Sequence, residues 1–126
     1  MLKKQRLFFE SGATRPLSFR LEKLETLFEQ IKKNEELIFN ALHADLKKPR
    51  FEAYVSELSF IYQDIAHTIK NLRHWVKPER VSTPLVHFKA CSEIHFEPLG
   101  VVLIISPWNY PFQLLLSPLI GAIAAG

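Results

Sequence analysis

Glycine and cysteine are both scarce in this chain of 126 residues, which holds four glycines and one cysteine. The glycines are not arranged as G-x-G-x-x-G or as a complete P-loop, so a glycine-rich phosphate cradle is excluded from this segment. The single cysteine, Cys91, excludes a disulfide within the chain. Since a reduced thiol fits a reducing compartment, we expect a cytoplasmic protein.

Charged residues are rare after residue 80, where Lys89, Glu93 and Glu97 alone carry charge. Before that point basic and acidic residues are interleaved, and the net charge is +3. A nucleic-acid-binding surface needs basic residues gathered on one face, so we expect no nucleic-acid partner. The distribution instead predicts surface-rich helices in the first part of the chain and a buried last part.

The sequence also lacks a metal-ligand pattern. Its five histidines form no i, i+4 pair and have no cysteine partner, so we expect no metal site. His87 and His95 lie within the reach of a hairpin from Cys91 and are candidate bases for a thiol nucleophile. Their alternation with apolar residues places them on the solvent side, which favours an incidental turn cysteine.

Residues 98–126 form a long uncharged segment, and a membrane-spanning helix needs about 20 apolar residues. The segment contains four prolines as well as Asn109 and Gln113. In a membrane-spanning helix, the interruption by P-W-N-Y-P at residues 107–111 would expose backbone groups to lipid. Burial of this segment in a protein core is therefore favoured over stable membrane insertion. A membrane-anchored protein, with residues 99–126 inserted, is the least favoured interpretation.

Apolar residues spaced three and four apart predict helices throughout residues 1–80. Gly12 is the expected C-cap of the first helix, and Asn34 is the expected N-cap that separates the second helix from the third. The last helix has the clearest apolar face, which begins at Phe51. The expected helices are residues 5–10, 16–33, 34–46 and 51–76, which together make up an N-terminal helical part, residues 1–80.

After residue 84 the apolar period changes to two, which is typical of strands. Residues 85–90 and 93–97 predict a β-hairpin within a second part, residues 81–98. Residues 101–105 are apolar at every position, as in a parallel strand covered on both faces. A helix with a kink at Pro118 is expected from Phe112 to Ala125.

The predicted order is helices, a hairpin and one strand-turn-helix unit, which indicates an α/β fold. A parallel strand needs a neighbouring strand for its hydrogen bonds. A helix that is apolar on every face needs other elements packed around it. We therefore expect the chain to be the beginning of a larger α/β protein, with residues 99–126 as its third part. The alternative is a non-catalytic helical interaction module whose apolar tail docks on a partner.

The exit from the predicted strand, S-P-W-N-Y-P at residues 106–111, is the candidate functional site. Open α/β folds bind ligands at the carboxyl ends of their strands. The Asn109 side chain either closes a hydrogen-bonded Asx-type turn or contacts a ligand. The residue pattern alone slightly favours the structural turn.

Residues 97–113, EPLGVVLIISPWNYPFQ, followed by PLIGAIAAG at residues 118–126, resemble the aldehyde dehydrogenase superfamily, in particular its class 3 branch. Shorter matching motifs extend the resemblance over the whole chain: SGATR at 11–15, FRLEKL at 19–24, DLKKP at 45–49, FEAY at 51–54 and VSTP at 81–84. The resemblance implies that residues 99–126 begin a Rossmann-like NAD(P)-binding domain. It also implies oxidation of an aldehyde substrate to a carboxylic acid with NAD or NADP as cofactor.

The same resemblance assigns roles to the residues of the turn. Asn109 matches the side-chain donor of the family's oxyanion hole, which stabilises the negative oxygen formed when a cysteine attacks the aldehyde. Ile105, Ser106, Pro107 and Trp108 match the wall along which the cofactor lies.

The resemblance also says what lies outside this segment. The hairpin, residues 85–97, matches strands used in oligomerisation, which implies a homodimer for the full-length enzyme. The nucleophilic cysteine and the general-base glutamate fall beyond residue 126, and Cys91 does not match the nucleophile. Residues 1–126 alone are therefore expected to be inactive.

Overall fold

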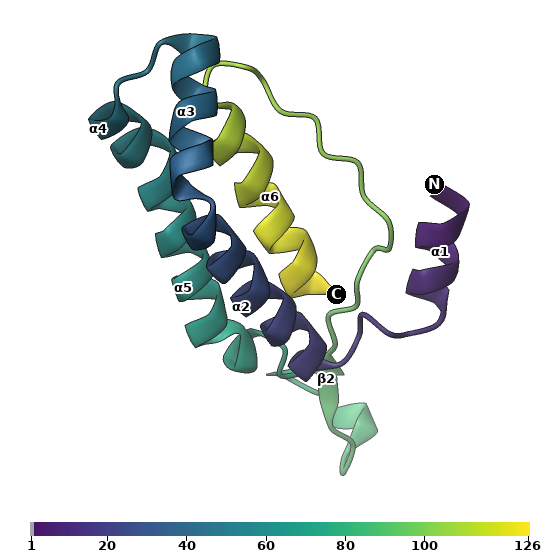
Figure 1. Ribbon diagram of the computed structural model, residues 1–126. Helices are drawn as coiled ribbons and strands as arrows, with labels where there is room; N and C mark the ends of the chain where they lie inside the picture. Colours follow the sequence, from purple (N-terminus) through teal and green to yellow (C-terminus); the bar gives the residue numbers. More distant parts are fainter. Residues whose placement is uncertain (1) are drawn as a thin grey trace.

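The computed structural model describes residues 2–126, in which a layer of helices carries a projecting hairpin and a long extended segment (Figure 1). A π-helical turn joins α4 to α5, and a 3-10 turn lies between the two strands. The helices predicted from apolar spacing are present. The elements in chain order are α1 (Leu2–Glu10), α2 (Leu17–Lys33), α3 (Glu35–Leu46), α4 (Arg50–Ala53), η1 (Tyr54–Leu58), α5 (Ser59–Trp75), β1 (Glu79–Val81), η2 (Leu85–His87), β2 (Ser92–Ile94) and α6 (Pro111–Ala125).

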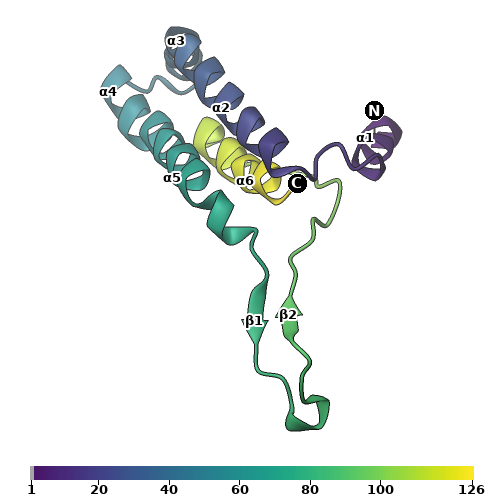
Figure 2. The same cartoon turned by 90° about the horizontal axis from the view of Figure 1, so that it is seen from below.

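The main core lies where α2, α5 and α6 pack against one another, as Figures 1 and 2 show from two directions. Apolar side chains three and four residues apart share one face of a helix, so packing that face removes them together from water. Leu24, Ile61 and Ile65 have no exposed surface. Helix α6, which begins one residue earlier than predicted, contributes Ile120 and Ala124.

Within residues 2–126, none of the helices has both the length and the apolar composition needed to cross a membrane.

The boundary between α2 and α3 lies at Asn34, which takes the predicted N-cap position but makes no side-chain capping hydrogen bond. The side-chain amide of Asn34 donates to the carbonyl oxygen of Gln30 at 2.7 Å. Its backbone, at φ −107° and ψ 15°, is not in the extended conformation from which a side chain reaches forward to the next turn. Asn34 therefore belongs to both helix ends: its side chain bonds back to α2, while its carbonyl oxygen accepts from Ile38 N of α3 at 3.0 Å.

The fourth predicted helix is interrupted by the π-helical turn η1, which carries one extra residue per hydrogen-bonded turn. The insertion rotates the residues before it relative to α5. Phe51, predicted to start the buried face, is 80% exposed, whereas Ala53 and Leu58 have no exposed surface. The predicted apolar face, residues 51–76, is therefore correct from Leu58 to Leu72 and wrong at both ends, where Tyr54 and Trp75 are each 45% exposed.

The hairpin has a different first strand from the one predicted. Residues 85–90 form local turns instead, in which His87 N donates to Pro84 O and Phe88 N to Leu85 O. Leu85 is 91% and Phe88 80% exposed, so the alternating apolar side chains are not buried as those of a half-buried strand would be. The observed antiparallel register pairs Glu79 with Ile94, Arg80 with Glu93 and Val81 with Ser92.

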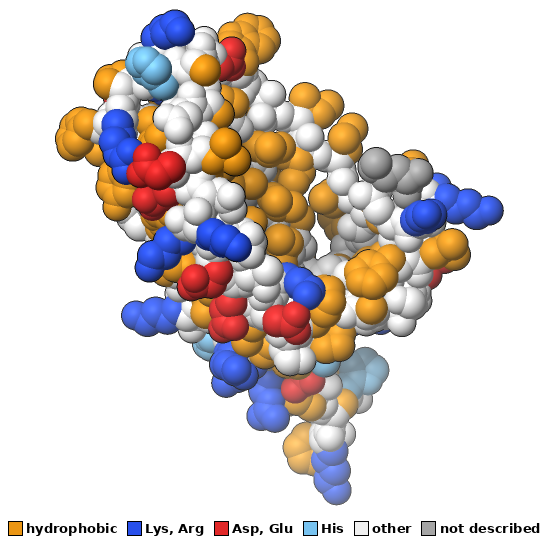
Figure 3. Space-filling view, viewed as in Figure 1, with side chains coloured by type: hydrophobic (Ala, Val, Ile, Leu, Met, Phe, Trp, Pro, Cys, Tyr) orange, Lys and Arg blue, Asp and Glu red, His pale blue; other side chains and the backbone are white. Residues whose placement is uncertain are grey.

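Residues 101–105, predicted as a buried strand, are extended and unpaired among the residues that the structure describes. Leu103 and Ile105 are each 84% exposed. A strand forms only where a neighbour completes its backbone hydrogen bonds, and no such neighbour lies alongside within residues 2–126. Figure 3 shows hydrophobic side chains gathered between α2 and this segment. The fold is thus mixed and helix-dominated, with a small antiparallel sheet and no Rossmann-like strand in the described part.

Tyr62 on α5 makes stability depend on pH at the alkaline end. Its hydroxyl donates to Glu35 Oε1 at 2.6 Å, and burial, assisted by this carboxylate, raises the pKa of Tyr62. The folded state therefore holds the proton more tightly than an unfolded chain, where tyrosine has a pKa of about 10.

We expect the contribution of Tyr62 to the free energy of unfolding to be constant below pH ~10 and to fall as pH rises above it, because the unfolded chain releases this proton first. Tyr62→Phe should flatten that dependence. Denaturant unfolding of both proteins on the two sides of this pH measures the difference. Equal slopes for the two proteins would contradict the expectation.

Candidate functional site

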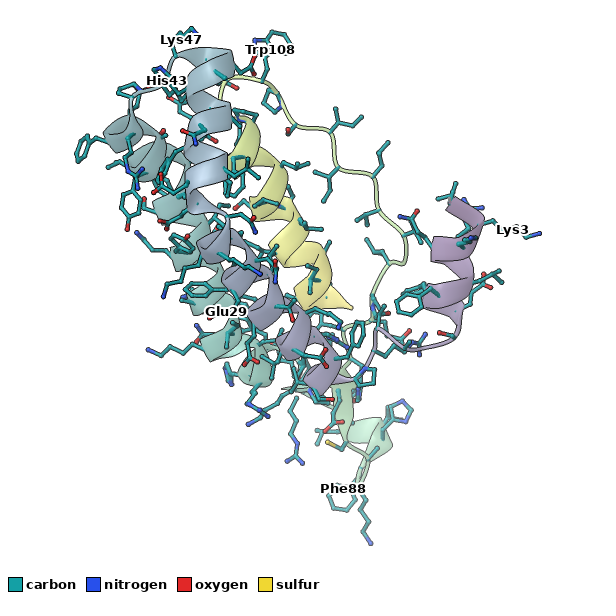
Figure 4. The ribbon with its side chains drawn as sticks, viewed as in Figure 1. Lys3, Glu29, His43, Lys47, Phe88 and Trp108 are labelled. Carbon is teal, nitrogen blue, oxygen red and sulfur yellow. The ribbon has the colours of Figure 1, made fainter. Side chains whose placement is uncertain are left out.

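The turn at residues 106–111 lies where the extended segment enters α6, beside the C-terminal end of α3 (Figure 1). Asn109 is exposed, Trp108 is 83% exposed and Ser106 is half-buried. Figure 4 places Trp108 at the same end of the molecule as His43 and Lys47, with its side chain pointing away from the helices. The predicted site residues therefore form one continuous, open surface.

Lys48, in the loop after α3, holds this turn. Its Nζ donates to the backbone oxygen of Asn109 at 2.9 Å and lies 4.0 Å from the centre of the Tyr110 ring. The same Nζ donates to Glu57 Oε1 at 2.5 Å. Lys48 is only 8% exposed, so a lysine that the sequence assigns to a solvated helix end is a buried cation.

Glu57, in η1, completes the arrangement. Its second oxygen, Oε2, accepts hydrogen bonds from the backbone N–H groups of Phe112 and Gln113, both at 3.0 Å. These groups belong to the first turn of α6 and have no partner within the helix. The carboxylate therefore caps α6 from another helix, where the helix dipole favours a negative charge.

The Lys48–Glu57 pair is buried on both sides, with side-chain exposures of 9% and 0%. Taking two charges out of water is costly unless both are well hydrogen-bonded. Here each charge has further partners, and all of these belong to residues 109–113. Removing one partner of such a pair costs about 3–5 kcal/mol, because it leaves the other charge uncompensated.

The side-chain amide of Asn109 differs from the backbone around it. Within residues 2–126 it makes no hydrogen bond, whereas the Asn109 carbonyl is held by Lys48. The structural interpretation, in which the amide closes an Asx-type turn, is therefore wrong. An anchored backbone with a free amide can present two N–H donors to a ligand.

Sequence reasoning missed both Lys48 and Glu57. One signal was present: Ala53, Glu57, Ile61 and Ile65 are four residues apart, so the carboxylate lies in line with buried apolar residues. A charged residue in such a row needs a buried partner. Nothing comparable marked Lys48, because a lysine near a helix C-terminus is usually solvated.

The other candidates lie elsewhere. Cys91 is exposed in the hairpin, which projects from the end of the molecule opposite Trp108 (Figure 4). His95 contacts Glu93 at 3.3 Å rather than a thiol. Among residues 2–126, no group of three or more His, Cys, Asp or Glu is arranged to hold a metal ion.

Comparison with known proteins gives a consistent result. Residues 3–126 match the model of the aldehyde dehydrogenase family. A dimeric NADP-preferring aldehyde dehydrogenase of Canis lupus familiaris is 46% identical over 127 residues, covering 100% of this chain and 28% of that protein. Aldehyde dehydrogenase family 3 member B1 of Bos taurus is 46% identical over 125 residues, covering 99% of this chain and 27% of that protein.

The fold agrees with these matches. A solved structure, the substrate-bound state of AldH from Staphylococcus aureus, has a TM-score of 0.97 and 46% sequence identity to this chain. The match covers 99% of this chain and 27% of that one. The chain thus spans about a quarter of the length of the relatives it matches. Since the family model covers nearly every residue, this chain belongs to the aldehyde dehydrogenase family and resembles its class 3 members.

Proposed function

We propose that the complete protein oxidises an aldehyde to a carboxylic acid with NAD or NADP, through a cysteine thiohemiacetal whose oxyanion accepts a hydrogen bond from Asn109. The observation that supports this role is the contrast at Asn109: its backbone is anchored by Lys48 while its amide is exposed and unbonded within residues 2–126. Family membership favours this function over a non-catalytic interaction module.

The chemistry of a carboxamide suits the task. Attack of a thiolate on the aldehyde carbon turns the carbonyl oxygen into an alkoxide, which needs a donor that does not give up its proton. The amide of Asn109 is neutral and donates through N–H, so it stabilises the alkoxide without protonating it. Because the turn is already fixed by Lys48, little reorganisation is needed when the charge develops.

The cofactor wall is compatible with the residues present. Ile105 and Trp108 are 84% and 83% exposed, and with Pro107 they offer apolar surface to a flat ring. Ser106 adds a hydroxyl. When bound, the nicotinamide accepts the hydride that leaves the aldehyde carbon, and water supplies the second oxygen of the acid. These residues would contact and orient the cofactor, whereas its phosphates would need groups outside this glycine-poor segment.

The assembly and location are further parts of the proposal. We propose a cytoplasmic homodimer in which the hairpin, residues 79–94, takes part in the contact between subunits. The name of the canine relative describes that protein as dimeric. The exposed apolar side chains of Leu85, Val86 and Phe88 on the hairpin support such a contact.

The direct test is an assay of the complete protein for aldehyde-dependent reduction of the cofactor. We expect reduced cofactor to form only when aldehyde and either NAD or NADP are both present, at the kcat of about 1–10³ s⁻¹ typical of enzymes. Absence of reduction with both cofactors over a panel of aliphatic and aromatic aldehydes would contradict the proposal.

A further inference from the structure

We propose that the buried Lys48–Glu57 pair is the positioning device of the oxyanion site and sets where the Asn109 amide points. This inference rests on the proposed role of Asn109. Neither residue lies in the motif that carries Asn109: Lys48 comes from the loop after α3 and Glu57 from η1. They are positioning residues, because they contact the backbone around Asn109 and not its amide.

The pair holds the turn at two points, at Asn109 itself and at the first turn of α6. On the Asn109 side, Lys48 Nζ donates to the residue's own carbonyl oxygen at 2.9 Å and lies over the Tyr110 ring. On the helix side, Glu57 holds the N–H groups of Phe112 and Gln113 at 3.0 Å. The salt bridge of 2.5 Å between them makes the two attachments one unit.

The chain before the turn provides little restraint. Residues 102–107 have no regular secondary structure, and Ile105 and Trp108 are almost fully exposed. The backbone of Asn109 is therefore held by Lys48 and by the residues that follow it in the chain, which Glu57 attaches through α6. A side-chain amide follows its backbone through two rotatable bonds, so a shift of the Asn109 backbone moves the donor directly.

The position of the pair argues against a role in packing alone. Apolar residues of similar volume often replace a buried ion pair without loss of stability. What an apolar pair does not supply is the set of directed bonds to residues 109–113. Helix α6 packs against the core from Phe112 onward, through Leu116, Ile120 and Ala124. Asn109 lies before these residues, and the bond that holds its carbonyl oxygen comes from Lys48.

The experiment is a double-mutant cycle in the complete enzyme. Glu57→Gln removes the charge but keeps an oxygen that can accept from Phe112 or Gln113. Its effect on kcat, KM and the single-turnover rate is measured alone and together with Asn109→Ala. The matched control is Glu36→Gln, which removes a carboxylate that pairs with Arg50 at 2.5 Å on the surface, with side-chain exposures of 69% and 60%.

We expect Glu57→Gln to lower kcat and the single-turnover rate by about tenfold to a hundredfold, since a misplacement of about 1 Å costs roughly 10²-fold. KM should change little, the pattern of an interaction made only in the transition state. In the Asn109→Ala background the same substitution should have almost no further effect, because the donor it positions is gone. Glu36→Gln should leave all three constants unchanged.

The outcomes separate this inference from the function on which it rests. If Asn109→Ala leaves kcat unchanged, the proposed oxyanion role fails. If Asn109→Ala lowers kcat but Glu57→Gln does not, or if their effects multiply in the double variant, the positioning role fails and the oxyanion role stands.

Should Glu57→Gln not fold, Lys48→Met carries the same test, because it leaves both bonds from Glu57 to α6 in place. Loss of folding in both variants would overturn the positioning role, since the pair would then be a general support of the fold. Circular dichroism and thermal unfolding of each purified variant decide this point before kinetics are compared.

Discussion

Replacing Asn109 by alanine is expected to lower kcat of the complete enzyme by about 10²- to 10³-fold, the loss seen when one oxyanion donor is removed. The reason is that the amide acts on charge that exists only after the thiolate has attacked. KM for the cofactor should stay close to its original value, because Asn109 is not among the residues proposed to line the cofactor. Steady-state and single-turnover kinetics measure both quantities.

Two variants sharpen this experiment. Asn109→Asp keeps the shape of the side chain but replaces the donor by a negative charge, so its activity should be no higher than that of Asn109→Ala. Asn40→Ala removes an exposed amide on α3, far from the turn in sequence, and should leave kcat unchanged. A folded Asn109→Ala enzyme with normal single-turnover kinetics would remove Asn109 from the oxyanion site.

The second large effect concerns stability. Ile61→Ala is expected to lower the free energy of unfolding by about 2–5 kcal/mol, because it opens a cavity among packed apolar side chains. Ile61 has no exposed surface and belongs to the core formed by α2, α5 and α6. Denaturant unfolding followed by circular dichroism measures the change.

Phe51→Ala is the matched comparison, since the sequence places Phe51 and Ile61 on one buried face. The structure leaves Phe51 80% exposed on α4. Its replacement should therefore change the free energy of unfolding by no more than about 0.5 kcal/mol. Equal losses for the two substitutions would mean that η1 does not turn Phe51 away from the core.

The spacing of apolar residues predicted the structure correctly where one face of a helix is buried in the core. The spacing of Leu21, Leu24 and Ile31 in α2, and of Ile61 and Ile65 in α5, predicted both the helices and the side chains in their core. This works because the helical period is fixed by backbone geometry, so spacing alone determines which side chains share a face. The motif likewise located Asn109 in the turn that precedes α6.

Pattern failed where a strand depended on a partner that spacing does not specify. Residues 85–90 alternate and residues 101–105 are apolar throughout, yet neither is a strand within residues 2–126. The strand that does pair with β2 is Glu79–Val81, a segment without an alternating signal. A single strand has no stable hydrogen bonding of its own, so its identity depends on which segment lies beside it.

By itself, then, the sequence determined the helices, the apolar faces that form the core and the position of Asn109 at a rigid turn. The tertiary structure alone decided what holds that turn. Lys48 lies 61 residues from Asn109, and Glu57 lies 55 residues from Phe112. No periodicity links positions so far apart. They became partners because the packing of η1 against α6 buries two charges that are stable only in contact with each other and with the residues around Asn109.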